Sequence, residues 1–113
     1  MVQYMRSSPL DIVIAAISDP TRRAIVDRLA RGPATITDVA QPFAISLTGF
    51  CKHVRVLERA GLIRRTRHGR DNTLSLTAEP LKDVAHWVFS YSRFWNTQLD
   101  RTESHFAARK EKR

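Results

Sequence analysis

Apolar residues recur along most of the chain at the three- and four-residue steps of amphipathic helices. The first helical stretch begins near Pro9, and its apolar side chains point in nearly all directions: Leu10, Ile12, Val13, Ile14 and Ile17. A helix that is apolar all round must be covered all round. We expect the protein's own core to cover one side and a second subunit to cover the other.

A second helix is predicted after Ser18 or Asp19, either of which is a suitable N-cap, with Pro20 in its first turn. Gly32-Pro33 ends this helix. The next stretch, "TITDVAQPF", predicts a short helix capped by Thr35, and residues 43–46 predict a tight turn.

Ser46 is a good N-cap for a fourth helix, predicted over residues 46–60, which buries Phe50, Val54 and Leu57 at steps of four and three residues. Gly61 ends it. Its outer face carries Thr48, Cys51, Lys52, Arg55 and Arg59.

Two short alternating segments, "LIRRTR" and "TLSLT", surround the turn-forming sequence "HGRDN" and predict a hairpin over residues 62–77. A long helix is predicted over residues 80–106, followed by a disordered basic tail over residues 107–113. The aromatic surface of that helix exceeds what a small core can bury, so the excess indicates a dimer interface.

The predicted fold is mainly α with a small β-hairpin, in a single domain over residues 1–106. A short helix, a tight turn and a second helix with a basic face form a helix-turn-helix, and the hairpin after it forms a wing. Such a helix fits the major groove of DNA, and a basic hairpin can lie along the phosphates or reach the minor groove.

Charge supports a polyanionic partner, because the formal net charge is +8 and the sequence pI is about 10.8. Seven Lys and Arg residues and a single acid, Glu58, lie between Lys52 and Arg70. We find no stretch that predicts a membrane span or a leader peptide, and the single cysteine, Cys51, fits a reducing compartment. These features predict a cytoplasmic protein without a membrane partner.

At these residues the chain resembles the ArsR family of winged helix-turn-helix transcriptional regulators. The matching text is "SDPTRRAIVDRLARGPATITDVA", "ISLTGFCKHVRVLERAGLIRR" and "HGRDNTLSL", which together span roughly residues 10–77. The resemblance implies a homodimer, formed by the first and last helices, that binds a two-fold-related double-stranded operator and represses transcription. It leaves the effector small molecule unknown.

Two departures from the family pattern argue against a metal. Metal-sensing members carry a Cys-x-Cys type motif before the turn, whereas "TITDVAQPF" has no thiol. A second family site uses paired residues on the last helix; Asp83 and His86 are three apart here, but Glu103 and His105 are two apart and diverge around a helix. We therefore predict no metal and no other cofactor.

The candidate DNA-binding residues are taken from the helix and the wing. Arg55 is suited to a guanine and Lys52 to a phosphate or a guanine. For His53 a phosphate contact and a packed helix histidine are equally open, and for Gly49 close approach to DNA competes with chance. The full set is Ser46, Thr48, Gly49, Cys51, Lys52, His53, Arg55, Arg59, Arg67, His68, Arg70 and Asn72.

The candidate dimer interface combines apolar residues of the first and last helices: Leu10, Val13, Ile14, Ile17, Val84, Val88, Tyr91, Trp95, Leu99 and Phe106. Tyr91, Phe94 and Trp95 could line an effector pocket or could simply pack in the core, and we prefer packing.

Cys51 is a candidate redox switch, since a bulky adduct on a groove-facing thiol would block DNA. The preferred alternative is a neutral replacement of serine.

Two other functions compete with a repressor. A thiol enzyme using Cys51 and His53 is disfavoured, because residues two apart on a helix point about 200° away from each other. The stronger alternative is a winged-helix module that binds protein or RNA without operator specificity.

Overall fold

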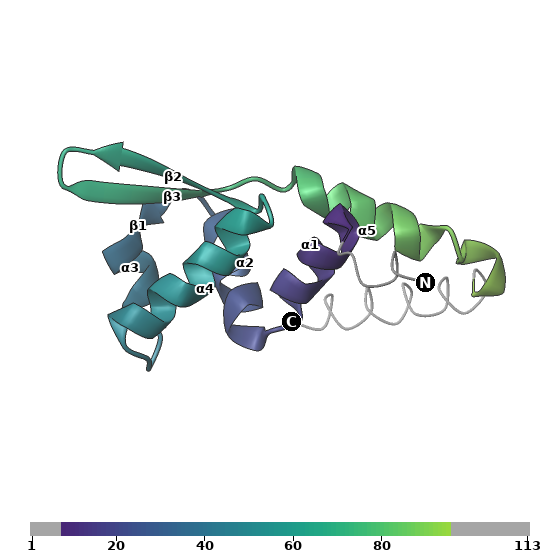
Figure 1. Cartoon of the computed structure of the whole chain (residues 1–113), viewed down its shortest axis with the longest axis horizontal. Helices are drawn as coiled ribbons and strands as arrows, with labels where there is room; N and C mark the ends of the chain where they lie inside the picture. The colour runs from purple at the N-terminus through teal and green to yellow at the C-terminus, as the bar shows by residue number, and fades with distance from the viewer. Residues whose placement is uncertain (1–7, 96–113) are drawn as a thin grey trace, which may run out of the picture.

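A computed structural model describes residues 8–95, and it is mainly helical with a small sheet, as the sequence predicts (Figure 1). The elements in chain order are α1 (Pro9–Ile17), α2 (Pro20–Ala30), β1 (Ala34–Thr35), α3 (Ile36–Ala40), α4 (Leu47–Arg59), β2 (Ile63–His68), β3 (Asp71–Leu76), α5 (Glu79–Phe89) and a 3₁₀ turn (Ser92–Phe94). Among these residues, no helix has both the length and the apolar character needed to span a bilayer.

Side-chain caps set the starts of the helices that build the helix-turn-helix. Of the two candidates before α2, Asp19 rather than Ser18 is the cap: its carboxylate accepts from the backbone N–H three residues on, at 2.9 Å. Thr35 before α3 and Ser46 before α4 do the same with their hydroxyl groups, at 3.1 and 3.0 Å. The predicted starts of α3 and α4 are therefore confirmed, and each cap satisfies a backbone donor that the helix leaves free.

The sheet has three antiparallel strands in the order β1-β3-β2, one more than the predicted hairpin. β1 pairs only Ala34 with Leu74 and Thr35 with Thr73. Two residues are too few to leave an alternating pattern in the sequence, so β1 was missed.

The hairpin closes through a two-residue turn, because His68 pairs with Asp71. Gly69 has a φ of +61°, and no residue other than glycine has a positive φ in the described chain. A positive φ at the first turn residue alone is the pattern of a type II′ turn, whose twist matches that of the strands.

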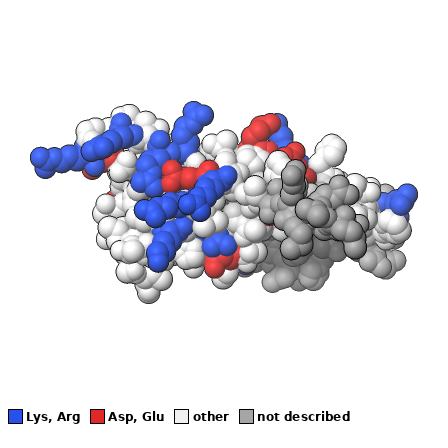
Figure 2. All heavy atoms as spheres, in the orientation of Figure 1, with Lys and Arg blue, Asp and Glu red and all other residues white. Residues whose placement is uncertain are grey.

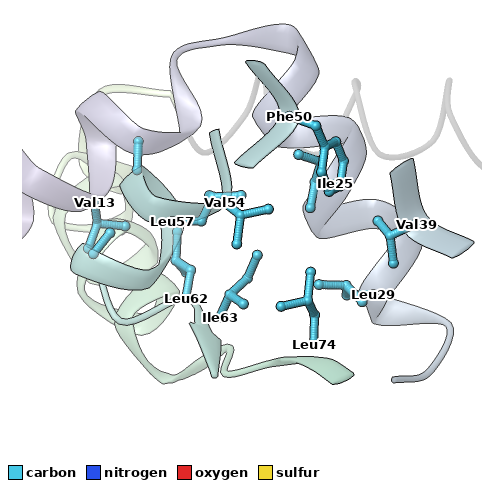
Figure 3. Close-up of a cluster of buried hydrophobic side chains, with 12 residues drawn as sticks. Val13, Ile25, Leu29, Val39, Phe50, Val54, Leu57, Leu62, Ile63 and Leu74 are labelled. Atoms are coloured by element: carbon cyan, nitrogen blue, oxygen red, sulfur yellow. The ribbon is translucent and has the colours of Figure 1, made fainter. Parts of the chain in front are cut away.

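The core lies where α1, α2, α3 and α4 meet the inner end of the sheet, and Figure 3 shows its side chains converging from these elements. Its buried members are Val13, Ala16, Ile25, Leu29, Val39, Phe50, Val54, Leu57, Ala60, Leu62, Ile63 and Leu74. The predicted buried stripe of α4 is confirmed in full. Phe43, in the turn before α4, packs its ring 5.6 Å from that of Phe50, which ties the turn to the core.

The prediction of one continuous helix over residues 80–106 is wrong within the described residues. α5 ends at Phe89, and a 3₁₀ turn follows. The hydroxyl of Ser90 donates to the carbonyl of Trp87 at 2.6 Å, a local bond that competes with helix continuation. Residues 96–106 of the predicted helix and the predicted tail over 107–113 lie outside the described residues.

Part of the predicted cover of α1 comes from the core of the protomer itself. α1 packs against α2, α4 and α5. Val13, predicted at the dimer interface, is only 3% exposed and belongs to the core, because it faces these neighbouring helices. Ile12, the residue before it, is 40% exposed.

Candidate nucleic-acid interface

The outer face of α4 presents the predicted side chains together. A shallow hollow of about 250 Å³ is lined by Thr48, Cys51, Lys52 and Arg55, joined by Leu47. The helix can present this face because Phe50, Val54 and Leu57 anchor its opposite side in the core. Four of the predicted residues thus form one continuous surface at the N-terminal part of the helix.

The start of α4 is compact as well as capped. The hydroxyl of Ser46 accepts from the backbone N–H of Gly49 at 3.0 Å. A Cβ atom at Gly49 would lie 3.3 Å from that hydroxyl, so a side chain there would crowd the cap. Both residues belong to the predicted set, and the structure brings them next to Thr48.

The hairpin projects beyond the core. Within β2, Ile63 is buried and every later residue is exposed, and in β3 Leu74 alone is buried. Arg67 folds over the turn, where its Nε donates to the carbonyl of Gly69 at 3.0 Å. His68 is exposed beside it. The outer part of the hairpin is therefore held by its backbone pairing and is free to meet a partner.

A second hollow of about 250 Å³ lies where the hairpin approaches the start of α4. The predicted residues Arg70 and Asn72 line it from the hairpin side, and Cys51 lines it from α4. The remaining lining comes from the start of α3, from Leu47 and from Arg65 and Asp71. The hairpin and the outer face of α4 thus adjoin each other.

An ion pair fixes the hairpin against α4. Nη2 of Arg65 donates to Oε1 of Glu58 at 2.8 Å. Glu58 is the single acid within the basic stretch, and its carboxylate faces β2. The pair links the hairpin to α4, and Lys52 and Arg55 take no part in it.

Figure 2 shows Lys and Arg side chains gathered over the hairpin and α4, with few acids among them. Among the described residues, the salt bridges of this region are Arg65 with Glu58 and the longer His53–Asp19 contact. A surface of this kind has a positive potential that attracts a polyanion.

His53 faces away from this surface. Its Nδ1 lies 3.3 Å from Nη1 of Arg22 and 3.9 Å from Oδ2 of Asp19, at the start of α2. An arginine has no acceptor, so a hydrogen bond between these two side chains requires Nδ1 to be an unprotonated nitrogen of the ring. Of the two alternatives for His53, the structure favours the packed helix histidine.

Arg22 is the centre of a junction among three helices. Its Nε and Nη2 donate to the carbonyls of Ala16 and Ala15 at 2.6 and 3.1 Å, where α1 ends. A cation there complements the helix dipole. The backbone N–H of Arg22 is the main cause that holds the pKa of Asp19 below its ordinary value of 3.8. Burial raises this pKa, and the charges of His53 and Arg22 lower it by smaller amounts.

Arg59 does not share the predicted surface. It lines two hollows with residues of α1, among them Ile12, and one of these hollows extends to the first turn of α5. Its place in the last turn of α4 is about 18 Å along the helix from the first residue. Arg59 therefore lies on the α1 side and apart from Thr48, Cys51, Lys52 and Arg55, and its contact with DNA stays a prediction.

The structure brings together no group of three or more potential metal ligands within residues 8–95. Asp83 and His86 lie in α5 and are exposed, and Glu103 and His105 lie outside the described residues.

Sequence reasoning missed two residues of this region. Leu47 lines both hollows around α4, although its spacing to Phe50 suggests the buried stripe. Arg22 joins α1, α2 and α4, and its only signal in the sequence is its position three residues after the cap Asp19.

The same arrangement recurs in known proteins. A family described as "Helix-turn-helix domain" matches residues 17–66, which run from the end of α1 to β2. The transcriptional repressor SdpR of Bacillus subtilis is 38% identical over 79 residues, which cover 70% of this chain and 88% of SdpR. The HTH-type transcriptional regulator Rv2034 of Mycobacterium tuberculosis is 42% identical over 84 residues, covering 74% of this chain and 76% of that protein.

Among solved structures, the crystal structure of an ArsR family transcriptional regulator superposes with a TM-score of 0.73 at 40% sequence identity. The match covers 78% of this chain and 91% of that one. The matches cover between 76% and 91% of the length of these relatives. The chain therefore belongs to the ArsR family of winged helix-turn-helix, DNA-binding transcriptional regulators.

Proposed function

We propose that the protein is a homodimeric repressor that binds an inverted-repeat operator in double-stranded DNA. The observation that carries this proposal is the continuous surface of α4 and the hairpin, on which Lys52, Arg55 and Arg70 are exposed beside the polar start of the helix. Its relatives and its fold are those of DNA-binding transcriptional regulators and not of enzymes.

In this proposal the first half of α4 enters the major groove. Arg55 reads a guanine through two hydrogen bonds, and Lys52 binds a phosphate or a guanine. Ser46, Thr48, Gly49 and Cys51 bring the backbone of the helix close to the base edges. The capped N-terminus of α4 supports this, since helix N-termini favour phosphate groups.

The hairpin supplies contacts with the DNA backbone or the minor groove through Arg67, His68, Arg70 and Asn72. Such contacts add salt-dependent affinity and carry little sequence information. The Arg65–Glu58 ion pair supports the proposal because it links the wing to α4.

The proposal of a dimer is supported by α5, none of whose residues is buried in the protomer. Trp87 is 48% exposed, and Val88, Phe89, Tyr91 and Phe94 are exposed as well. Five large apolar side chains exposed together on a small protein indicate an association surface. Besides Val88 and Tyr91, the proposed interface keeps the half-buried residues Leu10, Ile14, Ile17, Val84 and Trp95; Leu99 and Phe106 lie outside the described residues.

Repression is proposed from the relative SdpR, which is named a transcriptional repressor. The proposal includes a cytoplasmic location, where a transcriptional regulator meets its DNA.

Cys51 keeps its proposed role as an oxidation-sensitive position, because its half-buried thiol lines both hollows of the DNA-facing surface. An adduct there fills space that the proposal assigns to DNA. Serine at this position would serve equally well if the thiol has no such role.

Selection of duplex DNA from a random pool by the purified full chain tests the proposal. We expect enrichment of an inverted repeat whose half-sites lie one helical turn, about 10–10.5 base pairs, or a multiple of it apart. Binding to the selected duplex should weaken steeply as salt rises. Binding of all duplexes alike, or preference for single-stranded RNA or a protein, would support the winged-helix interaction module instead.

A further inference from the structure

Large exposed apolar side chains of the described residues fall into two groups. Six belong to α1, α5 or the segment after it: Ile12, Trp87, Val88, Phe89, Tyr91 and Phe94. The other two, Ile45 and Leu47, flank the N-cap of α4. The proposed dimer interface accounts for the five residues of α5 and the segment after it, and Ile12 lines the hollows beside Arg59. Ile45 and Leu47 remain unexplained.

Leu47 is the more exposed of this second pair, at 59%. It stands three residues before Phe50 and so continues the spacing of the buried stripe of α4. Its side chain is nevertheless on the open surface, about 40° around the helix from Cys51. The fold therefore presents a leucine where its pattern would place it in the core.

The surroundings of Leu47 identify the class of its partner. It lines the hollow with Lys52 and Arg55 on one side and the hollow with Arg65 and Arg70 on the other. An apolar protein or a lipid tail would have to cover these cations, at a large cost in desolvation. A polyanion with an apolar group on its surface fits the charges and the leucine together.

Double-stranded DNA provides that combination in the major groove. The base edges there carry hydrogen-bonding groups, and the C5-methyl group of thymine is their apolar group. An apolar side chain near the start of a recognition helix is well placed to meet it, since the N-terminal residues of such helices contact base edges.

We propose that Leu47 is a specificity-determining residue that contacts the C5-methyl group of a thymine in each half-site of the operator. This inference rests on the proposed function, because it requires the start of α4 to lie in the major groove. It adds a residue that recognises a base by apolar contact to those that act through hydrogen bonds and charge.

Replacement of thymine by uracil removes this methyl group and leaves the hydrogen-bonding edges of the base unchanged. The experiment measures affinity of the full chain for the selected operator and for duplexes with uracil at each thymine in turn. We expect one thymine per half-site at which uracil weakens binding about fourfold, from about 0.8 kcal/mol per buried methyl-sized group.

The variant Leu47→Ala then completes a double-mutant cycle. It should bind the thymine operator more weakly than the unchanged protein and should be indifferent to uracil at that position. Leu47→Met, which keeps an apolar side chain, should retain sensitivity to the methyl group. Because Leu47 is exposed, thermal unfolding of Leu47→Ala should match that of the unchanged protein, which separates recognition from folding.

Thr48 offers the matched control, because it neighbours Leu47 on the same surface and also carries a methyl group. Thr48→Ser removes that methyl group and should leave the effect of uracil intact. Loss of the effect in Thr48→Ser and its persistence in Leu47→Ala would overturn the proposal, as would an operator in which no thymine is sensitive to uracil.

The two proposals fail in distinguishable ways. A protein that selects no duplex at all refutes the proposed function and this inference together. A protein that selects an inverted repeat, with Leu47→Ala and uracil acting independently, refutes the role of Leu47 and leaves the proposed function standing.

Discussion

Arg65 in β2 donates to Glu58 in α4 across 2.8 Å, so the wing and the basic-faced helix are joined by the single acid of the basic stretch. Both side chains are about one third exposed, at 32% and 29%. Water screens such a pair, which limits its contribution to stability. The pair lies between α4 and the hairpin, which we propose to contact DNA, so we expect it to affect their relative orientation more than the stability of the fold.

Glu58→Gln should change the free energy of unfolding by less than about 1 kcal/mol in urea titrations. Binding to random duplex should strengthen, because a negative charge leaves a basic surface. The ratio of operator affinity to random-duplex affinity should fall, because the wing loses its fixed angle. An unchanged ratio would show that the ion pair does not position the wing.

Trp87→Ser should weaken self-association at least tenfold, because an exposed tryptophan contributes a large apolar area to an interface. Sedimentation equilibrium over a range of protein concentrations measures this. Val13→Ala is the matched control: loss of a buried side chain should cost about 2 kcal/mol of stability while dimer affinity stays near that of the unchanged protein. If Trp87→Ser associates normally, the face of α5 is not the dimer interface.

The pKa of Asp19 is lowered in the folded state, chiefly by the backbone N–H of Arg22. A lowered pKa means that the charged carboxylate stabilises the fold at pH values above its unfolded pKa, and that this contribution is lost as pH falls through the folded pKa. Asp19→Asn keeps a capping oxygen without the charge. The stability difference between the two proteins should be present at pH 5 and should shrink as the pH falls below about 4.

Thermal unfolding at each pH in matched buffers provides that comparison. A difference that grows on acidification would mean that Asp19 is not the stabilised carboxylate described above.

Alkylation of Cys51 with a bulky maleimide should lower operator affinity at least tenfold, because the thiol lines both hollows of the DNA-facing surface. The Cys51→Ser variant, treated in the same way, is the control and should bind like the untreated protein. Equal operator affinity before and after complete modification would remove both the redox role of Cys51 and its place at the DNA interface.

The sequence predicted the helix-turn-helix well because its signals are local. Thr35 and Ser46 are caps that act within one turn, and the buried stripe of α4 repeats often enough to define a face. The tight hairpin turn at Gly69 is equally local. These signals depend on neighbouring residues, which the sequence displays directly.

The features that the sequence did not predict depend on contacts between residues far apart in the chain or on competing local interactions. Pairing of β1 with β3 joins residues about forty positions apart. The inward turn of His53 depends on Arg22, on another helix. α5 ends at Phe89, where a serine hydroxyl bonds to the carbonyl of Trp87, although the apolar pattern continues beyond this point. Leu47 follows the period of the core stripe and yet lies outside the core. It is the first residue of α4 and lies beyond the end of the core.

We propose that the operator is recognised by the outer face of α4, and not by positive charge at any place on the protein. The most direct measurement compares Arg55→Ala with Lys82→Ala, which removes the same charge from α5, where Lys82 pairs with Glu79 at 3.3 Å. We predict that Arg55→Ala loses roughly five- to 150-fold in operator affinity, the equivalent of 1–3 kcal/mol, and that Lys82→Ala binds as the unchanged protein does. Equal losses in the two variants would contradict the account.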